Sequence, residues 1–285
     1  MSTQPKAGKA YWAVLLILIP PLAIVAAWFL LPIWAWLAVL ALLMLFLAIV
    51  GKQVVGLSRG AVVDLRNKVS LSRFQTVLWT VLIVSAFFVA AVHNVRGGQA
   101  DPLGITIPPE LWILLGVSVT SLVGAGLIKQ EKARSTPNRE SAELALTKAH
   151  LTEESDTLVK VGDYSVAAAD EAEAKSTGGR IMAKGVLAVN DSPQQSSWLD
   201  LFRSEEVGGI GRLDLGKIQM FYFTLIIVGS YAVAVGSALA AVSAKITALP
   251  GISEGAIALL GISHATYLTT KTVSSTSTSP AGRGS

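Results

Sequence analysis

Two similar stretches of sequence recur in this chain. LSRFQTVLWT runs from Leu71 to Thr80, and LGKIQMFYFT runs from Leu215 to Thr224, an offset of 215 − 71 = 144 residues. Each stretch opens a long apolar run, so each predicts a helix that begins in the same way. A basic residue and a glutamine stand at matching positions in both stretches: Arg73 and Gln75, Lys217 and Gln219.

The apolar runs that follow are also repeated. PPELWILLGVS, at residues 108–118, resembles SEGAIALLGIS, at residues 253–263, with one residue of slippage. Glu110 and Glu254 fall in the first turn of each helix, where the helix dipole favours an acid by about 0.3–1 kcal/mol. We therefore expect two copies of one helical hairpin, as parallel repeats about a pseudo-two-fold axis along the membrane normal. The copies span residues 74–128 and 217–271.

The composition indicates a membrane protein. Of 285 residues, 52% are hydrophobic, and only 15% are charged, against roughly 25% in soluble domains. The mean hydropathy is +0.57. Cysteine is absent and the three histidines lie far apart, so we expect no metal site, and no motif indicates a cofactor.

The N-terminal region predicts a further hairpin. Residues 11–50 contain no charged residue, and forty helical residues would extend about 60 Å, twice a bilayer core of about 30 Å. A turn at Pro32 would divide this segment into two helices that can each cross the bilayer. The alternative is one long helix broken at Pro20 and Pro21. We expect an all-α integral membrane protein with six transmembrane helices. The other four spans are residues 74–94, 110–128, 218–242 and 253–270.

Basic residues predict the orientation of the chain. With the N-terminus inside, only Arg96 and Lys245 lie outside, which leaves 23 − 2 = 21 Lys and Arg inside. Such a bias is typical of cytoplasmic loops, so both termini are predicted to be cytoplasmic in a bacterial inner membrane. The loop at residues 51–73 is a short basic part of this inner face. We expect no nucleic-acid binding, because the basic residues follow the membrane segments.

A long inner loop at residues 129–216 has a different composition. It holds 11 Lys or Arg and 15 Asp or Glu, a net charge of −4. Residues 129–185 contain few aromatics, so we expect little tertiary fold there. Flexible segments are also expected around Gly208, Gly209 and Gly211 and in the tail at residues 272–285.

Within this loop the sequence predicts a short amphipathic helix at residues 193–206. SPQQ, at residues 192–195, matches a capping box with proline at the first helical position. A membrane-surface helix is normally basic, and this one is net acidic, so we expect it to dock onto protein. Its apolar face is Trp198, Leu199, Leu201 and Phe202, and its polar face is Asp200, Arg203, Glu205 and Glu206.

Polar residues inside the spans are candidate sites. Ionisable groups in a membrane helix are functional candidates, although a neutral His264 can also simply bond a neighbouring hydroxyl. The matched glutamines Gln75 and Gln219 are predicted to clamp the two hairpins, with the ends at Lys129 and Lys271 as partners. Arg73 and Lys217 would reach toward lipid headgroups. The polar stripe of the last span is Ser263, His264, Thr266 and Tyr267.

The repeated motif resembles uncharacterised bacterial multi-pass inner-membrane proteins. Three features carry the resemblance. Within Leu71 to Thr80, a basic residue is followed by Gln and then by Trp-Thr, and one span later LLGVS stands at Leu114 to Ser118. A second, degenerate copy of the pattern ends at Lys271. The resemblance covers residues 64–128 and 186–271, and it implies the repeated helical hairpin but no activity.

Two functions are therefore expected to compete. The first is a structural or docking protein that recruits a cytoplasmic partner, and the second is a homo-oligomeric ion channel or pore. We expect no enzyme: GLSRG at residues 56–60 matches a nucleophile elbow, but it lies between membrane helices rather than on a strand and a helix. The expected contacts are the lipid bilayer, further copies of the chain and a cytoplasmic protein.

Overall fold

A computed structural model describes residues 7–135, 159–160, 181–184, 186–206, 209, 212–241 and 244–272. The chain divides into two compact units. Unit 1 comprises Met1–Ala61, Gln75–Ser118 and Phe223–Leu260. Unit 2 comprises Val62–Phe74, Val119–Tyr222 and Gly261–Ser285.

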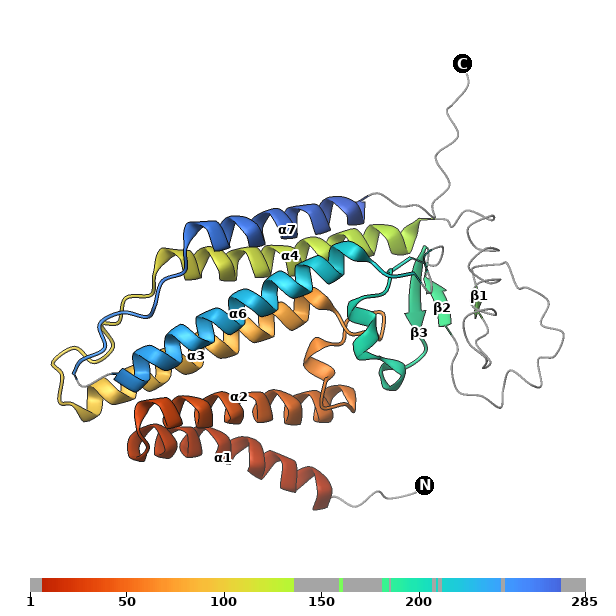
Figure 1. Cartoon of the computed structure of the whole chain (residues 1–285). Coiled ribbons are helices and arrows are strands. Elements are labelled where there is room, and N and C mark those ends of the chain that lie inside the picture. Colours follow the sequence, from red (N-terminus) through yellow and green to blue (C-terminus); the bar gives the residue numbers. More distant parts are fainter. Residues whose placement is uncertain are drawn as a thin grey trace. The chain divides into compact units, whose positions relative to one another are not determined.

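The protein is mostly helical. Within the described ranges, the six α-helices are α1 (Ala7–Phe29), α2 (Pro32–Val55), α3 (Leu71–Arg96), α4 (Pro109–Arg134), α6 (Leu215–Ala241) and α7 (Glu254–Thr272) (Figure 1). Five of them, all except α7, are long and apolar enough to cross a membrane, which supports a membrane location. The sixth predicted span is the shorter helix α7, which contains His264 and Lys271 and is less apolar.

The N-terminal residues form two helices that pack against each other. Helix α1 continues through Pro20 and Pro21 to Phe29, and α2 begins at Pro32 (Figure 1). The turn therefore lies at Pro32, as predicted, and the alternative of a break at the proline pair is not observed. Proline at the first position suits a helix start, because the backbone N–H it lacks has no partner there in any case.

Glycines explain the GLSRG segment structurally. Gly56 ends α2 in the left-handed region, with φ 84°, and its backbone N–H donates to the Lys52 carbonyl at 3.1 Å. A Cβ on Gly60 would lie 2.7 Å from the Gly51 carbonyl oxygen, so these two backbones can approach only as glycines. The segment is the end of a helix and a close backbone contact, with no strand beside it.

The core of unit 1 is apolar with a few neutral hydrogen bonds. Trp79, on α3, is fully buried and lies 6.1 Å between ring centroids from Tyr231 on α6. Trp36, on α2, donates from Nε1 to Ser85 Oγ at 3.0 Å. Because both groups are buried, each satisfies the other and neither leaves an unpaired polar atom in the core.

Hydrogen bonds connect two loops of unit 1. The Thr106 N–H donates to the Thr247 carbonyl at 2.8 Å, and the Leu249 N–H donates to the Thr106 carbonyl at 3.0 Å. Asn94, at the end of α3, binds the backbone of Ile246 through both its amide nitrogen and its amide oxygen, each at 2.8 Å. The loop after α3 and the loop after α6 thus form one connected structure.

Unit 2 contains a small sheet that the all-α prediction missed. Its strands are β1 (Val159–Lys160), β2 (Ile181–Lys184) and β3 (Leu187–Asn190), in the order β1-β2-β3. β1 pairs parallel with β2, and β2 pairs antiparallel with β3. The run IMAKGVLAVN contains two short β-prone segments separated by a glycine, a hairpin signal that the flexible-loop prediction overlooked. Other parts of the predicted flexible regions, at 136–158, 161–180, Gly208, Gly211 and 273–285, lie outside the described residues.

The predicted helix at residues 193–206 is instead two 3-10 helices. They span Pro193–Gln195 and Trp198–Leu201. Ser196 and Ser197 between them are extended, because Ser197 caps the second helix by accepting a hydrogen bond from the Leu199 N–H. Ser192 makes no side-chain cap, and the capping box is formed by Ser197 and Asp200.

Candidate functional site

A tight turn between α2 and α3 positions two charged residues of unit 2. The Asp64 carboxylate accepts from the Arg66 backbone N–H at 2.9 Å, a local bond typical of turns. Asn67 follows with φ 57°, and its side-chain amide donates to the Asn190 carbonyl at 2.8 Å. Asn190 returns a bond to the Asn67 carbonyl at 3.0 Å. This turn is therefore held in place by strand β3.

The same strand holds Glu205. The Ala188 N–H, on β3, donates to the Glu205 carbonyl at 3.0 Å. Nearby, Arg203 pairs with Leu213 in an antiparallel bridge, which fixes the segment before α6. Asp214 then caps α6 by accepting from the Lys217 N–H at 3.1 Å. Glu205 thus reaches the first turn of α6 from a rigid backbone.

The Glu205 carboxylate is a buried acceptor for four cations. Its Oε1 atom lies 2.8 Å from Lys271 Nζ, 3.2 Å from Lys217 Nζ, 3.3 Å from Arg66 Nη2 and 3.6 Å from Lys129 Nζ. These cations come from α7, α6, the turn before α3, and α4. One side chain therefore joins four separate chain segments of unit 2.

Asp64 completes this group. It lies 2.7 Å from Lys129 Nζ and 2.9 Å from Arg66 Nη2. We call these six residues the charge cluster: Asp64, Arg66, Lys129, Glu205, Lys217 and Lys271. Its formal charge is +4 from the cations and −2 from the carboxylates, a net of +2.

The cations control the protonation of both carboxylates. Burial raises the pKa of Glu205, but Arg66 and the three lysines lower it more, so the pKa lies well below its ordinary value. Burial likewise raises the pKa of Asp64, and Arg66 and Lys129 reverse this shift to leave the pKa well below its usual range. Both carboxylates are therefore charged near neutral pH.

Two further buried acids make local contacts in unit 2. Glu206 forms an ion pair with Lys132. The Asp200 carboxylate accepts from the Ser197 N–H at 2.8 Å and from the Val69 N–H at 3.2 Å. Burial lowers the pKa of Lys68 to about 8, although the negative charge of Asp200 acts in the opposite direction. Three of the predicted polar-face residues, Asp200, Glu205 and Glu206, thus face the protein interior.

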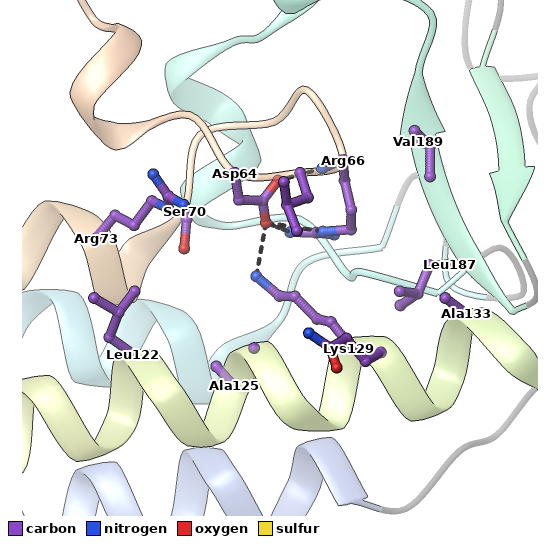
Figure 2. A pocket seen from close by; sticks show the side chains of 13 residues that line it. Asp64, Arg66, Ser70, Arg73, Leu122, Ala125, Lys129, Ala133, Leu187 and Val189 are labelled. Atoms are coloured by element: carbon purple, nitrogen blue, oxygen red, sulfur yellow. Dashed lines mark hydrogen bonds and ion pairs between the residues drawn. The ribbon is translucent and has the colours of Figure 1, made fainter. Parts of the chain in front are cut away.

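A cavity of about 250 Å³ adjoins the charge cluster. Figure 2 shows Asp64 bound to Lys129 and Arg66, and apolar side chains that come from β3 and from α4, the helix that also carries Lys129. Arg73 and Ser70, at the start of α3, also line it. The apolar lining includes Leu122, Ala125, Ala133, Leu187 and Val189.

The structure separates the residues of the predicted clamp. Gln75 is buried and its amide donates to Thr224 Oγ1 on α6, whereas Gln219 is exposed. Lys217 does not reach outward, because it is buried, bound to Glu205, and donates to the Arg203 carbonyl at 2.8 Å. Of the two basic residues of the predicted clamp, only Arg73 is partly exposed.

The predicted docking residues also divide into two groups. Trp198 and Leu199 are 51% and 55% exposed, whereas Leu201 is buried at 3%. Phe202 is half-buried, with its ring centroid 5.0 Å from that of Phe221. Beside them lies a groove of about 470 Å³. It is lined by Leu199, Phe202, Arg203, Arg212, Leu213, Ile218, Phe221 and Tyr222.

The predicted polar stripe of α7 is mostly buried. Ser263, His264 and Tyr267 are buried, and Thr266 is exposed. Tyr267 lies next to the charge cluster, since Lys271 Nζ is 4.2 Å from the centroid of its ring. The stripe is therefore partly an extension of the cluster.

Sequence reasoning missed the two acids that organise the site. Asp64 is not among the residues that the sequence singles out, and Glu205 is predicted only as part of the polar face of a helix at residues 193–206. A usable signal existed, because Asp64 is an acid inside an otherwise basic loop between two apolar helices. Within the described residues, no group of three or more His, Asp or Glu side chains could hold a metal ion.

Comparison with protein-family models, with curated proteins and with solved structures finds no match for this chain. The resemblance to uncharacterised bacterial membrane proteins therefore stays a prediction.

Proposed function

We propose that this protein is a multi-pass membrane docking protein that recruits a cytoplasmic partner. The helices anchor the chain in a bacterial inner membrane, and unit 2 presents the docking surface. We define this surface as Trp198, Leu199 and the side chains of the groove beside them.

The exposed aromatic and aliphatic side chains beside the groove carry this proposal. Trp198 and Leu199 are exposed on a short helix whose other side is fixed by buried Leu201 and Asp200. Aromatic and arginine side chains around a preformed hollow are the types that dominate binding energy in protein interfaces. The surface is therefore rigid and of the composition expected for a binding site.

The charges at the groove indicate the chemistry of the partner. The neighbouring acids Asp200, Glu205 and Glu206 are buried, so the exposed charges at the groove are those of Arg203 and Arg212. A complementary segment would insert apolar side chains and place carboxylates beside these arginines. The acidic surface expected from the sequence is replaced by a basic one, so the proposed partner is acidic.

We also propose an orientation of the chain in the membrane and a repeated helical hairpin. We infer six spans with both termini cytoplasmic, supported by the 21 to 2 division of basic residues. Helices α3 and α6 begin at the aligned residues Leu71 and Leu215, which supports parallel hairpin repeats. A single cysteine at Leu65, which is 88% exposed, should be labelled only from inside, and one at Gly98 only from outside. Outside labelling at position 65 would contradict the orientation.

Photo-crosslinking tests the docking surface in cells. A photo-reactive amino acid at Leu199 should form an adduct with a specific protein, and one at Leu103, 63% exposed in another loop, should not. Charge reversal by Arg203→Glu and Arg212→Glu should abolish the adduct without reducing membrane insertion. Crosslinks to lipid alone would show that bilayer covers the surface and would reject docking. Crosslinks to a second copy would identify self-association.

A homo-oligomeric pore is the alternative proposal. The exposed Thr266 on α7 supports it, because a path through an assembly must be lined by side chains that a single copy leaves exposed. Such a path would not be lined by His264, which is buried. Conductance of the purified protein in a planar bilayer, lost on Thr266→Leu, would favour the pore over docking.

A further inference from the structure

We propose that the cavity beside the charge cluster binds a phosphate-bearing anion, supplied by the headgroup of an anionic membrane phospholipid. The cavity is defined above by Asp64, Arg66, Arg73 and Lys129 together with an apolar wall. This site is separate from the docking surface, with which it shares no lining residue.

The charge cluster contains more cations than carboxylates. The formal charge of the charge cluster is +4 − 2 = +2, and its charged side chains are all largely buried. Buried charge without a partner is unfavourable, because the charge loses its hydration. The neighbouring acid Glu206 is paired with Lys132, outside the cluster. A phosphate group of charge −1 or −2 would offset the surplus.

Hydrogen-bond donors line part of the cavity. Arg73 lines it with a half-buried guanidinium group, and it makes no ion pair with any described residue. Ser70 and Gln130 add a hydroxyl and an amide to the lining. Figure 2 shows Arg73 and Ser70 beside Asp64, with Lys129 reaching the same carboxylate from α4. Planar guanidinium groups bind phosphate through paired hydrogen bonds.

Apolar side chains line another part of the cavity. Leu122, Ala125 and Gly126 lie on α4, which is one of the five candidate membrane spans. Leu187 and Val189 of β3 complete this wall. A small hydrophilic ion would leave these side chains without contacts. A phospholipid uses both sides, because its phosphate meets the cations and its glycerol and first acyl carbons meet the apolar wall.

Two variants separate ligand binding from a purely structural role. Arg73→Gln removes a cation that is outside the charge cluster. Its control is Arg134→Gln, which removes an exposed cation from α4 that does not line the cavity. Gly126→Leu fills the cavity, since a Cβ at Gly126 meets nothing within 4 Å. Its control is Gly116→Leu, on the same helix, where a Cβ also meets open space.

The experiment uses the full chain in lipid nanodiscs and in detergent. In one arm, thermal unfolding is compared in discs of phosphatidylcholine alone and with phosphatidylglycerol, and native mass spectrometry records retained lipid. In the other arm, inorganic phosphate replaces chloride at constant ionic strength in detergent. Binding to the folded state raises the unfolding temperature in proportion to ligand occupancy.

We expect phosphatidylglycerol to raise the unfolding temperature and to stay bound to the wild type and both controls. Arg73→Gln should weaken this binding by about tenfold, as expected for a charged hydrogen bond, and Gly126→Leu should abolish it. A response to inorganic phosphate alone, lost in the same two variants, would keep the anion site but reject the lipid source. No response in either arm, or equal responses in variants and controls, would overturn the proposal.

Discussion

The interiors of the two units are held together by different interactions. Among the described residues, the eight charged residues that are buried as whole residues all belong to unit 2. The buried polar contacts of unit 1 are neutral, such as Trp36 with Ser85 and Gln75 with Thr224. Those of unit 2 include a carboxylate shared by four cations.

This contrast shows how each unit should respond to change. A neutral hydrogen bond in a membrane core contributes modestly, on average about 0.6 kcal/mol. A buried ion pair costs about 3–5 kcal/mol when one partner is removed, because the other charge stays buried and unpaired. Unit 2 should therefore be sensitive to charge and pH, and unit 1 to the size of its side chains.

The largest expected effect is that of Glu205→Gln. The change keeps the size of the side chain but leaves the four cations of the cluster with Asp64 alone, so the free energy of unfolding should fall by about 3–5 kcal/mol. Chemical unfolding of the purified protein in detergent measures this loss. Glu131→Gln, which removes an exposed acid from α4, is the control. Equal effects of the two changes would remove the contrast between the units.

The second-largest effect is expected in acid, where unit 2 should lose stability. The folded pKa values of Glu205 and Asp64 are below their ordinary values of 4.5 and 3.8. Their contribution is fully present above the ordinary values and is lost as pH falls through the lower folded values. The unfolding temperature should thus depend little on these groups from pH 7 to about 4.5 and fall below that. Glu205→Gln should reduce the acid dependence, and an unchanged profile would contradict the assignment.

Raising the pH should have the opposite and smaller effect: the stability of unit 2 should increase as Lys68 loses its proton. Burial lowers its folded pKa to about 8 from an ordinary value of 10.5. Between these values the unfolded chain keeps the proton that the folded chain has released, so stability rises with pH. Comparison of the wild type with Lys68→Met at pH 7.5 and 9.5 measures this. The unfolding temperature of the wild type should rise relative to that of Lys68→Met at the higher pH, and a constant difference would exclude this role.

The smallest effect concerns the two matched glutamines. Gln75→Leu should lower the free energy of unfolding by about 0.6 kcal/mol, because it removes the hydrogen bond from the buried Gln75 amide to Thr224. Gln219→Leu should have no measurable effect, because Gln219 is exposed. Thermal unfolding of both variants in the same detergent measures the two losses of stability. Equal losses would restore the symmetric clamp predicted from the sequence.

The sequence predicted the helical architecture better than the site. Hydrophobic runs and Pro32 were enough to place the first two helices, because a long uncharged segment has few other solutions. The surroundings of Glu205 depend on α4, α6 and α7 and on a turn 139 residues earlier. Periodicity describes one segment at a time, so it placed Glu205 on a polar surface although tertiary contacts bury it.

The repeat shows the same limit. Helix starts at Leu71 and Leu215 follow from local sequence, but the environments of Gln75 and Gln219 do not match. Residues further along the chain decide whether each side chain is covered. A repeated motif therefore predicts equivalent helices, and it does not predict equivalent partners for their side chains.

The loop contacts of Asn94 have a consequence for biosynthesis. Asn94 binds the backbone of Ile246, which lies 152 residues later in the chain. At about 5–20 residues per second, the ribosome needs roughly 8–30 s to make that distance. For this whole interval the loop after α3 exists without the backbone that Asn94 binds. The insertion machinery has this window in which to hold the loop, and the loop after α6 closes it once Ile246 has been synthesised.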